Sequence, residues 1–206
     1  MKIYFVRHGE TGGNIAMRHQ SDNTDLTQKG LLQATQAAQI IKTKNPTHLI
    51  TSTMLRALET ARIIGLAVDL IPETSALFAE VGRPARLNGR LLKSAYSLWF
   101  YARWYFGLTN MNNEGGETYK MFRDRLKQAR EQLATYPPEA VVVVVSHSVF
   151  INFFIMHVCD DRPIGPIRAL QCFIRILTIK NGSITPISLD TTLPENACRF
   201  KVEKLT

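Results

Sequence analysis

The sequence predicts a three-layer α/β/α sandwich with a mostly parallel central sheet. Short apolar strands alternate with amphipathic helices along most of the 206 residues, a pattern typical of a sheet covered by helices. The valine run Val141–Val145 is apolar on both faces, as expected for a strand at the centre of such a sheet. Asn181-Gly182 separates two later apolar runs, which predicts a hairpin and therefore an antiparallel edge.

The first half of the chain contains three predicted strands and two predicted helices. Ile3–Val6 is a short apolar strand, and the polar segment 9–25 is expected to be a loop. Thr27 can cap a helix that extends to about Lys42, where apolar residues recur at the helical period, and Asn45-Pro46 ends it. The other predictions here are a strand over His48–Thr51, a helix over Leu55–Ile64 that Gly65 terminates, and a weaker strand over Val68–Ile71 before Pro72.

The second half begins its regular structure with a long helix. Thr118 is expected to cap this helix, which extends to about Tyr136 and stops at Pro137-Pro138. Segment 140–159 has no Lys, Arg, Asp or Glu over about the length that a bilayer needs, yet polar side chains interrupt it and valines fill its first half. We therefore expect a strand, a turn and a helix there. The hairpin strands are predicted over Cys172–Ile179 and Ser183–Ser188.

Segment 96–106 contains seven aromatic side chains in one helical-looking stretch. We interpret it as part of a helical lid insertion at about 84–114 within a single domain that spans 1–206. A helix that packs its aromatic side chains into the core is the favoured interpretation. Two others stay open: a lid that narrows a pocket, and a basic amphipathic helix that lies on a membrane surface.

The chain carries 25 Lys and Arg against 17 Asp and Glu, a net charge of +8, which favours an anionic ligand. Segment 81–113 alone contains five basic residues and no acidic one, so we expect a phosphorylated small-molecule substrate that is polyanionic. No recognised nucleic-acid motif accompanies the charge, and no transmembrane segment is expected. Three widely spaced cysteines suggest neither a disulfide framework nor a zinc site, so a cytoplasmic location is the simplest setting.

Three polar clusters directly follow predicted strands. In an open α/β sheet ligands bind at the carboxyl ends of the strands, so these clusters should meet in space. Together they supply two histidines and two arginines, which suit a tetrahedral dianion because guanidinium groups bind phosphate oxygens in pairs. Metal-site, serine-hydrolase and nucleotide P-loop motifs are missing from the sequence. The clusters are Arg7-His8-Gly9-Glu10-Thr11, Ser52 with Arg56, and Ser146-His147-Ser148.

With their flanking residues, these clusters resemble the histidine phosphatase superfamily, the phosphoglycerate mutase-like proteins. The resemblance covers most of the chain in order and implies a phosphoglycerate mutase-like fold. The segments that carry it are Arg7-His8-Gly9-Glu10-Thr11 with Asn14, Ser52-Thr53-Met54-Leu55-Arg56-Ala57-Leu58-Glu59-Thr60-Ala61, and Val145-Ser146-His147.

The resemblance also implies roles for site residues. His8 would be the nucleophile that accepts the phosphoryl group as a covalent phosphohistidine, and His147 would hydrogen-bond that group. Glu80 would be the catalytic acid that protonates the leaving group. The residues implied to bind the substrate phosphate are Arg7, Arg56, His147, Asn14 and Gln20. Metal ions and other cofactors are not implied.

The sequence therefore predicts a metal-independent phosphatase that hydrolyses phosphate monoesters. A phosphoglycerate mutase is the near alternative, although Gly82-Arg83-Pro84 after Glu80 and Ser148 after His147 depart from the mutase pattern. A module of another class, non-catalytic and binding phosphate or a membrane surface, also stays open, as does a homodimer. The other histidines, His19, His48 and His157, are expected to be structural or surface residues.

Overall fold

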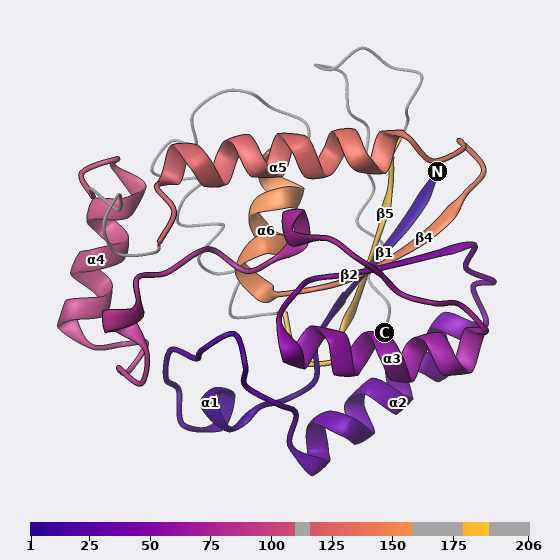
Figure 1. Ribbon diagram of the computed structural model, residues 1–206, viewed down its shortest axis with the longest axis horizontal. Helices are drawn as coiled ribbons and strands as arrows, with labels where there is room; N and C mark the ends of the chain where they lie inside the picture. The colour runs from indigo at the N-terminus through magenta and orange to yellow at the C-terminus, as the bar shows by residue number, and fades with distance from the viewer. Residues whose placement is uncertain (110–115, 158–178, 190–206) are drawn as a thin grey trace.

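A computed structural model describes residues 1–109, 116–157 and 179–189. In this part of the chain, a five-stranded sheet has the order β3-β2-β4-β1-β5 (Figure 1). All pairings are parallel except that of β5 with β1, so the mostly parallel sheet and its antiparallel strand are confirmed. The strands are β1 (Lys2–Arg7), β2 (His48–Thr51), β3 (Glu73–Thr74), β4 (Val141–Ser146) and β5 (Ile184–Ser188).

Helices cover both faces of the sheet (Figure 1), which confirms the three-layer sandwich. On β4, Val143 and Val145 pack against α2 and α3, whereas Val142 and Val144 pack against α5 and α6 on the other face. Because successive side chains of a strand point to opposite faces of the sheet, β4 contributes to a hydrophobic core on each face. The helices are α1 (Gly12–Ile15), α2 (Gln28–Lys42), α3 (Leu55–Val68), α4 (Ala95–Tyr105), α5 (Tyr119–Ala134) and α6 (Ser148–His157), with 3-10 turns at Ala76–Phe78 and Ala85–Leu87.

The predicted strand over 68–71 is wrong. Helix α3 continues through Gly65 to Val68 and ends at Asp69, whose left-handed backbone has a φ of 57°. The next strand is β3, which begins at Glu73. Gly65 does not terminate the helix: a Cβ there would lie 2.5 Å from the carbonyl oxygen of Leu70, so the glycine allows the following chain to cross close to the helix.

The structure differs from one further prediction and does not test another. The segment predicted as a loop over 9–25 contains the short helix α1, capped by Thr11 and Asn14 in a reciprocal capping box. The first predicted hairpin strand, 172–179, falls outside the described residues except for its last residue. Capping by Thr27 and Thr118 is confirmed, since each hydroxyl accepts a hydrogen bond from the backbone of its helix.

The aromatic segment forms α4, which lies at one end of the molecule beside the start of α5 (Figure 1). Phe100 and Trp104 are buried in the same core as β1 and β4, so the expected core packing is confirmed for them. Trp104 also donates a hydrogen bond from Nε1 to the backbone carbonyl of Glu117, at 2.8 Å. Trp99 and Phe106 are exposed. Among the described helices, none is long and apolar enough to cross a membrane.

Candidate active site

The two histidines of the predicted site lie together. His8 follows β1 and His147 follows β4, and these strands are neighbours in the sheet. The ring centroids are 5.0 Å apart, and both residues are buried. The backbone N–H of His8 donates to the carbonyl of Ser146 at 3.1 Å, which ties the ends of the two strands together.

Hydrogen bonds define which nitrogen of His8 can react. Nδ1 lies 2.7 Å from the carbonyl oxygen of Gly9, and since a carbonyl only accepts, Nδ1 carries the proton. Nε2 therefore holds the lone pair, and it accepts a hydrogen bond from Nε of Arg56 at 3.3 Å. Burial, then the charges of Arg56 and Arg7, hold the pKa of His8 well below its usual range. The ring is neutral and nucleophilic near pH 7.

A contact between two glycines positions the loop that carries His8. A Cβ on Gly9 would lie 2.3 Å from the carbonyl oxygen of Gly30 in α2, and one on Gly30 would lie 2.2 Å from the carbonyl oxygen of Glu10. The backbone N–H of Gly9 donates to Oγ1 of Thr60 in α3 at 3.2 Å. The loop is thus packed directly against both helices of this layer.

Arg56, in the first turn of α3, is only 2% exposed. Besides His8, its guanidinium donates to the backbone carbonyl of Ser21 at 3.1 Å and to Sδ of Met54 at 2.9 Å. Burial lowers its pKa to about 10, so it stays charged at neutral pH. Within the described residues no carboxylate forms an ion pair with it.

His147 and Arg7 each present a buried nitrogen atom without a partner. Nε2 of His147 lies 2.7 Å from Oγ of Ser52, whereas its Nδ1 has no hydrogen bond. Arg7 donates from Nη1 to the carbonyl of Ile179, while its Nε is buried without a partner. Burial lowers the pKa of His147 well below its usual range. Buried polar atoms without partners indicate where a polar ligand would fit.

Glu80 is buried beside these groups and bonds the start of α6. Its carboxylate accepts hydrogen bonds from the backbone N–H groups of Val81 at 3.1 Å, Val149 at 3.3 Å and Phe150 at 3.0 Å. Burial lowers the pKa of Arg7 and that of Arg56, and the charge of Glu80 opposes both shifts. The carboxylate therefore lies within electrostatic reach of both guanidinium groups.

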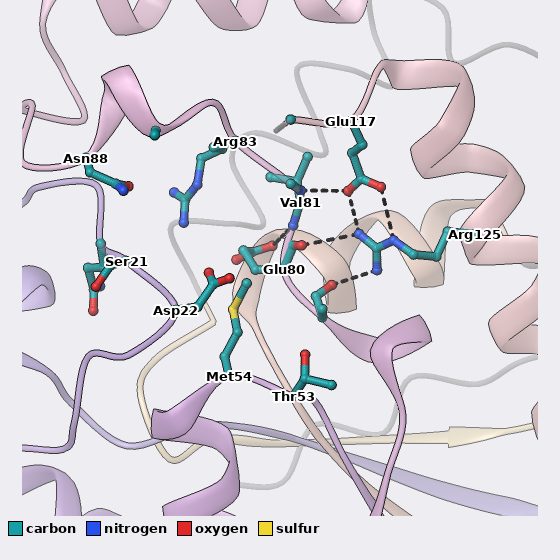
Figure 2. A pocket seen from close by; sticks show the side chains of 15 residues that line it. Ser21, Asp22, Thr53, Met54, Glu80, Val81, Arg83, Asn88, Glu117 and Arg125 are labelled. Atoms are coloured by element: carbon teal, nitrogen blue, oxygen red, sulfur yellow. Dashed lines mark hydrogen bonds and ion pairs between the residues drawn. The ribbon is translucent and has the colours of Figure 1, made fainter. Parts of the chain in front are cut away.

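Arg125 of α5 holds the loop that carries Glu80 (Figure 2). Its guanidinium donates to the backbone carbonyls of Leu77, Ala79 and Glu80 at 2.8 to 3.2 Å. It also pairs with Glu117, whose carboxylate accepts from the backbone N–H of Gly82 at 2.7 Å. Arg125 thus binds the loop up to Glu80, Glu117 binds it just after Glu80, and the two side chains form an ion pair with each other.

Glu80 also lines a pocket of about 540 Å³ (Figure 2). Gln20 lines the pocket as well, and its Oε1 accepts a hydrogen bond from Thr11 at 2.5 Å. Asn14 is not among the lining residues: its Oδ1 accepts from Thr11 at 3.1 Å and from Nδ2 of Asn181 at 3.0 Å. The structure therefore gives Asn14 hydrogen bonds that hold the loop after His8 and places Gln20 at the pocket.

Sequence reasoning missed several residues at this site. His19, which was expected to be structural or on the surface, is buried, and its Nδ1 lies 3.1 Å from Nη1 of Arg83, which lines the pocket. The aromatic helix contributes Tyr101, whose side chain lies close to Arg83. Asp22 also lines the pocket. In the sequence, the basic run after Glu80 signalled Arg83 and the aromatic segment 96–106 signalled Tyr101, whereas no pattern singled out His19 or Asp22.

The comparison with known families gives one match over nearly the whole chain. The model of the Histidine phosphatase superfamily (branch 1) matches residues 3–192. A protein of Erwinia tasmaniensis named "Probable phosphoglycerate mutase GpmB" is 31% identical over 160 residues, which are 75% of this chain and 73% of that protein. A protein of the same name from Proteus mirabilis is 28% identical over 155 residues, 74% of this chain and 72% of that protein.

Solved structures share the fold across almost the full length. A mycobacterial glucosyl-3-phosphoglycerate phosphatase in complex with VO3 superposes with a TM-score of 0.74 at 20% identity, covering 98% of this chain and 96% of that one. The alpha-ribazole phosphatase from Shigella flexneri gives a TM-score of 0.72 at 17% identity, covering 98% and 95%. At these identities the likeness establishes the fold.

Proposed function

Because the chain belongs to the histidine phosphatase superfamily (branch 1), we propose that it hydrolyses phosphate monoesters through a phosphohistidine at His8. The observation that carries the proposal is the tautomer of His8, whose Nε2 lone pair lies beside the guanidinium of Arg56 in a buried site. A neutral imidazole is a nucleophile, and a guanidinium binds the oxygens of the group that it attacks.

In the first step Nε2 of His8 attacks phosphorus and the bond between phosphorus and the ester oxygen breaks. Arg56 and Arg7 stabilise charge on the phosphoryl oxygens, and the unpartnered nitrogen atoms of Arg7 and His147 supply further hydrogen bonds. The departing oxygen takes a proton from Glu80.

In the second step a water molecule attacks the phosphohistidine, the bond between phosphorus and nitrogen breaks, and Glu80 accepts the proton of the water. Hydrogen bonds from three backbone N–H groups hold the side chain of Glu80 in place for this transfer. Inorganic phosphate then leaves, and His8 returns to its neutral state. The positive charge that this chemistry needs comes from the arginines, so the proposal requires no metal ion.

The same geometry serves a phosphoglycerate mutase if the phosphoryl group returns to the substrate instead of passing to water. Similarity to proteins named phosphoglycerate mutase favours this second candidate. In support of hydrolysis, several lining residues of the pocket, among them Ser21, Asp22 and Asn88, are exposed, so water can enter the pocket that Glu80 lines. The substrate class in either case is a phosphorylated small molecule.

One assay separates these candidates. The wild-type protein and His8→Ala are incubated with p-nitrophenyl phosphate and, separately, with 3-phosphoglycerate. We expect inorganic phosphate from the wild type, none above background from His8→Ala, and an acid-labile phosphoryl group trapped on His8. Conversion to 2-phosphoglycerate without phosphate release would assign the mutase instead. Unchanged hydrolysis by His8→Ala would disprove the mechanism. Phosphate binding by the wild type without turnover would favour the non-catalytic phosphate-binding module instead.

We also propose that the protein acts in the cytoplasm as a single domain with α4 as an insertion that packs beside Arg83 at the pocket. The contact of Tyr101 with Arg83 supports this role of α4. A homodimer stays a prediction, and light scattering after size-exclusion chromatography would test it.

A further inference from the structure

Arg83 is a cation in the pocket that the phosphoryl-transfer steps do not use. It follows Glu80 by three residues, and its guanidinium points into the pocket between Ser21 and Asn88 on one side and Glu80 on the other (Figure 2). The residue is half-buried. Arg86 and Arg90, the next arginines of the same basic run, are exposed and do not line the pocket.

Neutral groups hold Arg83 in this position. Oγ of Ser97 donates to the carbonyl of Leu91 at 2.8 Å, which uses its only proton. Nε2 of His19, 3.1 Å from the same oxygen, must therefore carry the ring proton. Nδ1 of His19 is left as an acceptor for the guanidinium of Arg83, at 3.1 Å.

The charge of Arg83 is not cancelled by this arrangement. Burial, then the charge of Arg83, lowers the pKa of His19 to about 4, so the ring is neutral at pH 7. Tyr101, a second neutral group, also lies close to Arg83, and its ring centroid is 5.8 Å from that of His19. Within the described residues no carboxylate oxygen lies within 4 Å of the guanidinium. By contrast, Arg125 pairs closely with Glu117.

A half-buried cation that is positioned by neutral partners and faces a cavity is suited to bind an anion from solution. Glu80 and Asp22 act on it only from beyond ion-pair distance. The phosphoryl group itself belongs near His8 and Arg56. An anion at Arg83 would therefore belong to the leaving group.

We propose that Arg83 binds a second anionic group, a carboxylate or a further phosphate, on the leaving group of the substrate. This inference rests on the proposed hydrolysis of phosphate monoesters at His8. It makes Arg83 a residue that determines specificity, with His19 as its positioning residue.

Matched substrates test the proposal. 3-Phosphoglycerate and glycerol 3-phosphate differ by a carboxylate in place of a hydroxymethyl group, and fructose 1,6-bisphosphate and fructose 6-phosphate differ by one phosphate. For Arg83→Gln we expect KM to rise about 10- to 100-fold for the member that carries the second anionic group in at least one pair, the loss typical of a charge-assisted hydrogen bond. KM for the members without the second anionic group, and kcat for all four substrates, should change less than about twofold. Arg83→Lys should restore part of the preference, and Arg86→Gln is the matched control.

A binding measurement keeps the test independent of turnover. Calorimetric titration of His8→Ala with the same pairs should show tighter binding of the members that carry the second anionic group. The double variant His8→Ala/Arg83→Gln should lose that preference. Equal weakening of both members of each pair, or no weakening, would overturn the proposal. Loss of hydrolysis and of phosphohistidine in the wild type, with the binding preference kept, would instead contradict the proposed function alone.

Discussion

Nε of Arg56 donates a hydrogen bond to Nε2 of His8 across 3.3 Å. The nitrogen that would attack phosphorus is thus paired with the guanidinium that would bind the phosphoryl oxygens. An incoming phosphoryl group must take over this hydrogen bond, because Nε2 has one lone pair. The contact keeps the imidazole neutral and correctly oriented until substrate arrives.

Replacing Arg56 should change both the rate and its pH dependence. We expect Arg56→Ala to lower kcat about 100- to 1,000-fold, as for the loss of one preorganised donor. The pKa of His8 should rise, because the charge of Arg56 is the second cause that lowers it, after burial. The acidic limb of the kcat/KM profile should therefore move to higher pH. Arg56→Lys, which keeps the charge, should leave that limb nearly in place; the opposite order would contradict this account.

Glu80 should matter in proportion to the leaving group's need for a proton. Glutamine accepts hydrogen bonds from the start of α6 but transfers no proton, so Glu80→Gln should slow an alkyl phosphate about 100- to 10,000-fold. The loss should be much smaller for p-nitrophenyl phosphate, whose leaving group departs unprotonated. Asp22→Asn is the control, since Asp22 lines the same pocket. If Asp22→Asn showed the leaving-group dependence instead, Asp22 would be the acid.

Acid should destabilise the fold through its buried histidines. The pKa values of His8, His147 and His19 lie below the ordinary value of 6.5, so below that pH the unfolded chain binds protons that the folded chain does not. The free energy of unfolding should fall by about 1.4 kcal/mol per pH unit for each such histidine. Urea unfolding between pH 7.5 and 5 measures this slope. A stable His19→Gln variant should show a shallower one, and an unchanged slope would contradict a neutral buried ring.

Arg125 should stabilise the fold as well as the site. Its ion pair with Glu117 is mostly buried, with side chains 16% and 12% exposed, so Arg125→Ala leaves a carboxylate and several carbonyls without their partner. We expect a loss of about 2 to 3 kcal/mol in the free energy of unfolding, below the range for fully buried pairs. Chemical denaturation measures it, with the exposed Lys120→Ala as control. A loss no larger than that of the control would contradict a stabilising role for Arg125.

NMR can test the interaction between His19 and Arg83 directly. In Arg83→Gln the pKa of His19 should rise from about 4 but stay below 6.5, because burial is the larger cause of the shift and Arg83 the second. Titration of the ring C–H resonances measures this value. A pKa that stayed near 4 would mean that the two side chains do not interact in solution.

The amino-acid sequence was enough to predict the fold class and to bring the residues of the candidate site together. Alternating apolar runs and local caps such as Thr27 and Thr118 depend only on near neighbours, and the structure confirms them. His8 and His147 could be brought together in advance because parallel strands end at the same edge of a sheet.

Tertiary structure alone decided the wall of the pocket. Arg83 reaches His19 across 64 positions of the chain, and Arg125 reaches the loop of Glu80 across 45. No local pattern encodes such contacts, because they depend on how α4 and α5 pack over the sheet. Gly65 shows that even a nearby contact can override propensity: its local preference suggested a helix end, whereas the close approach of Leu70 required a glycine inside the helix. In both cases the packing of one part of the chain against another decided the structure, and residue preference did not.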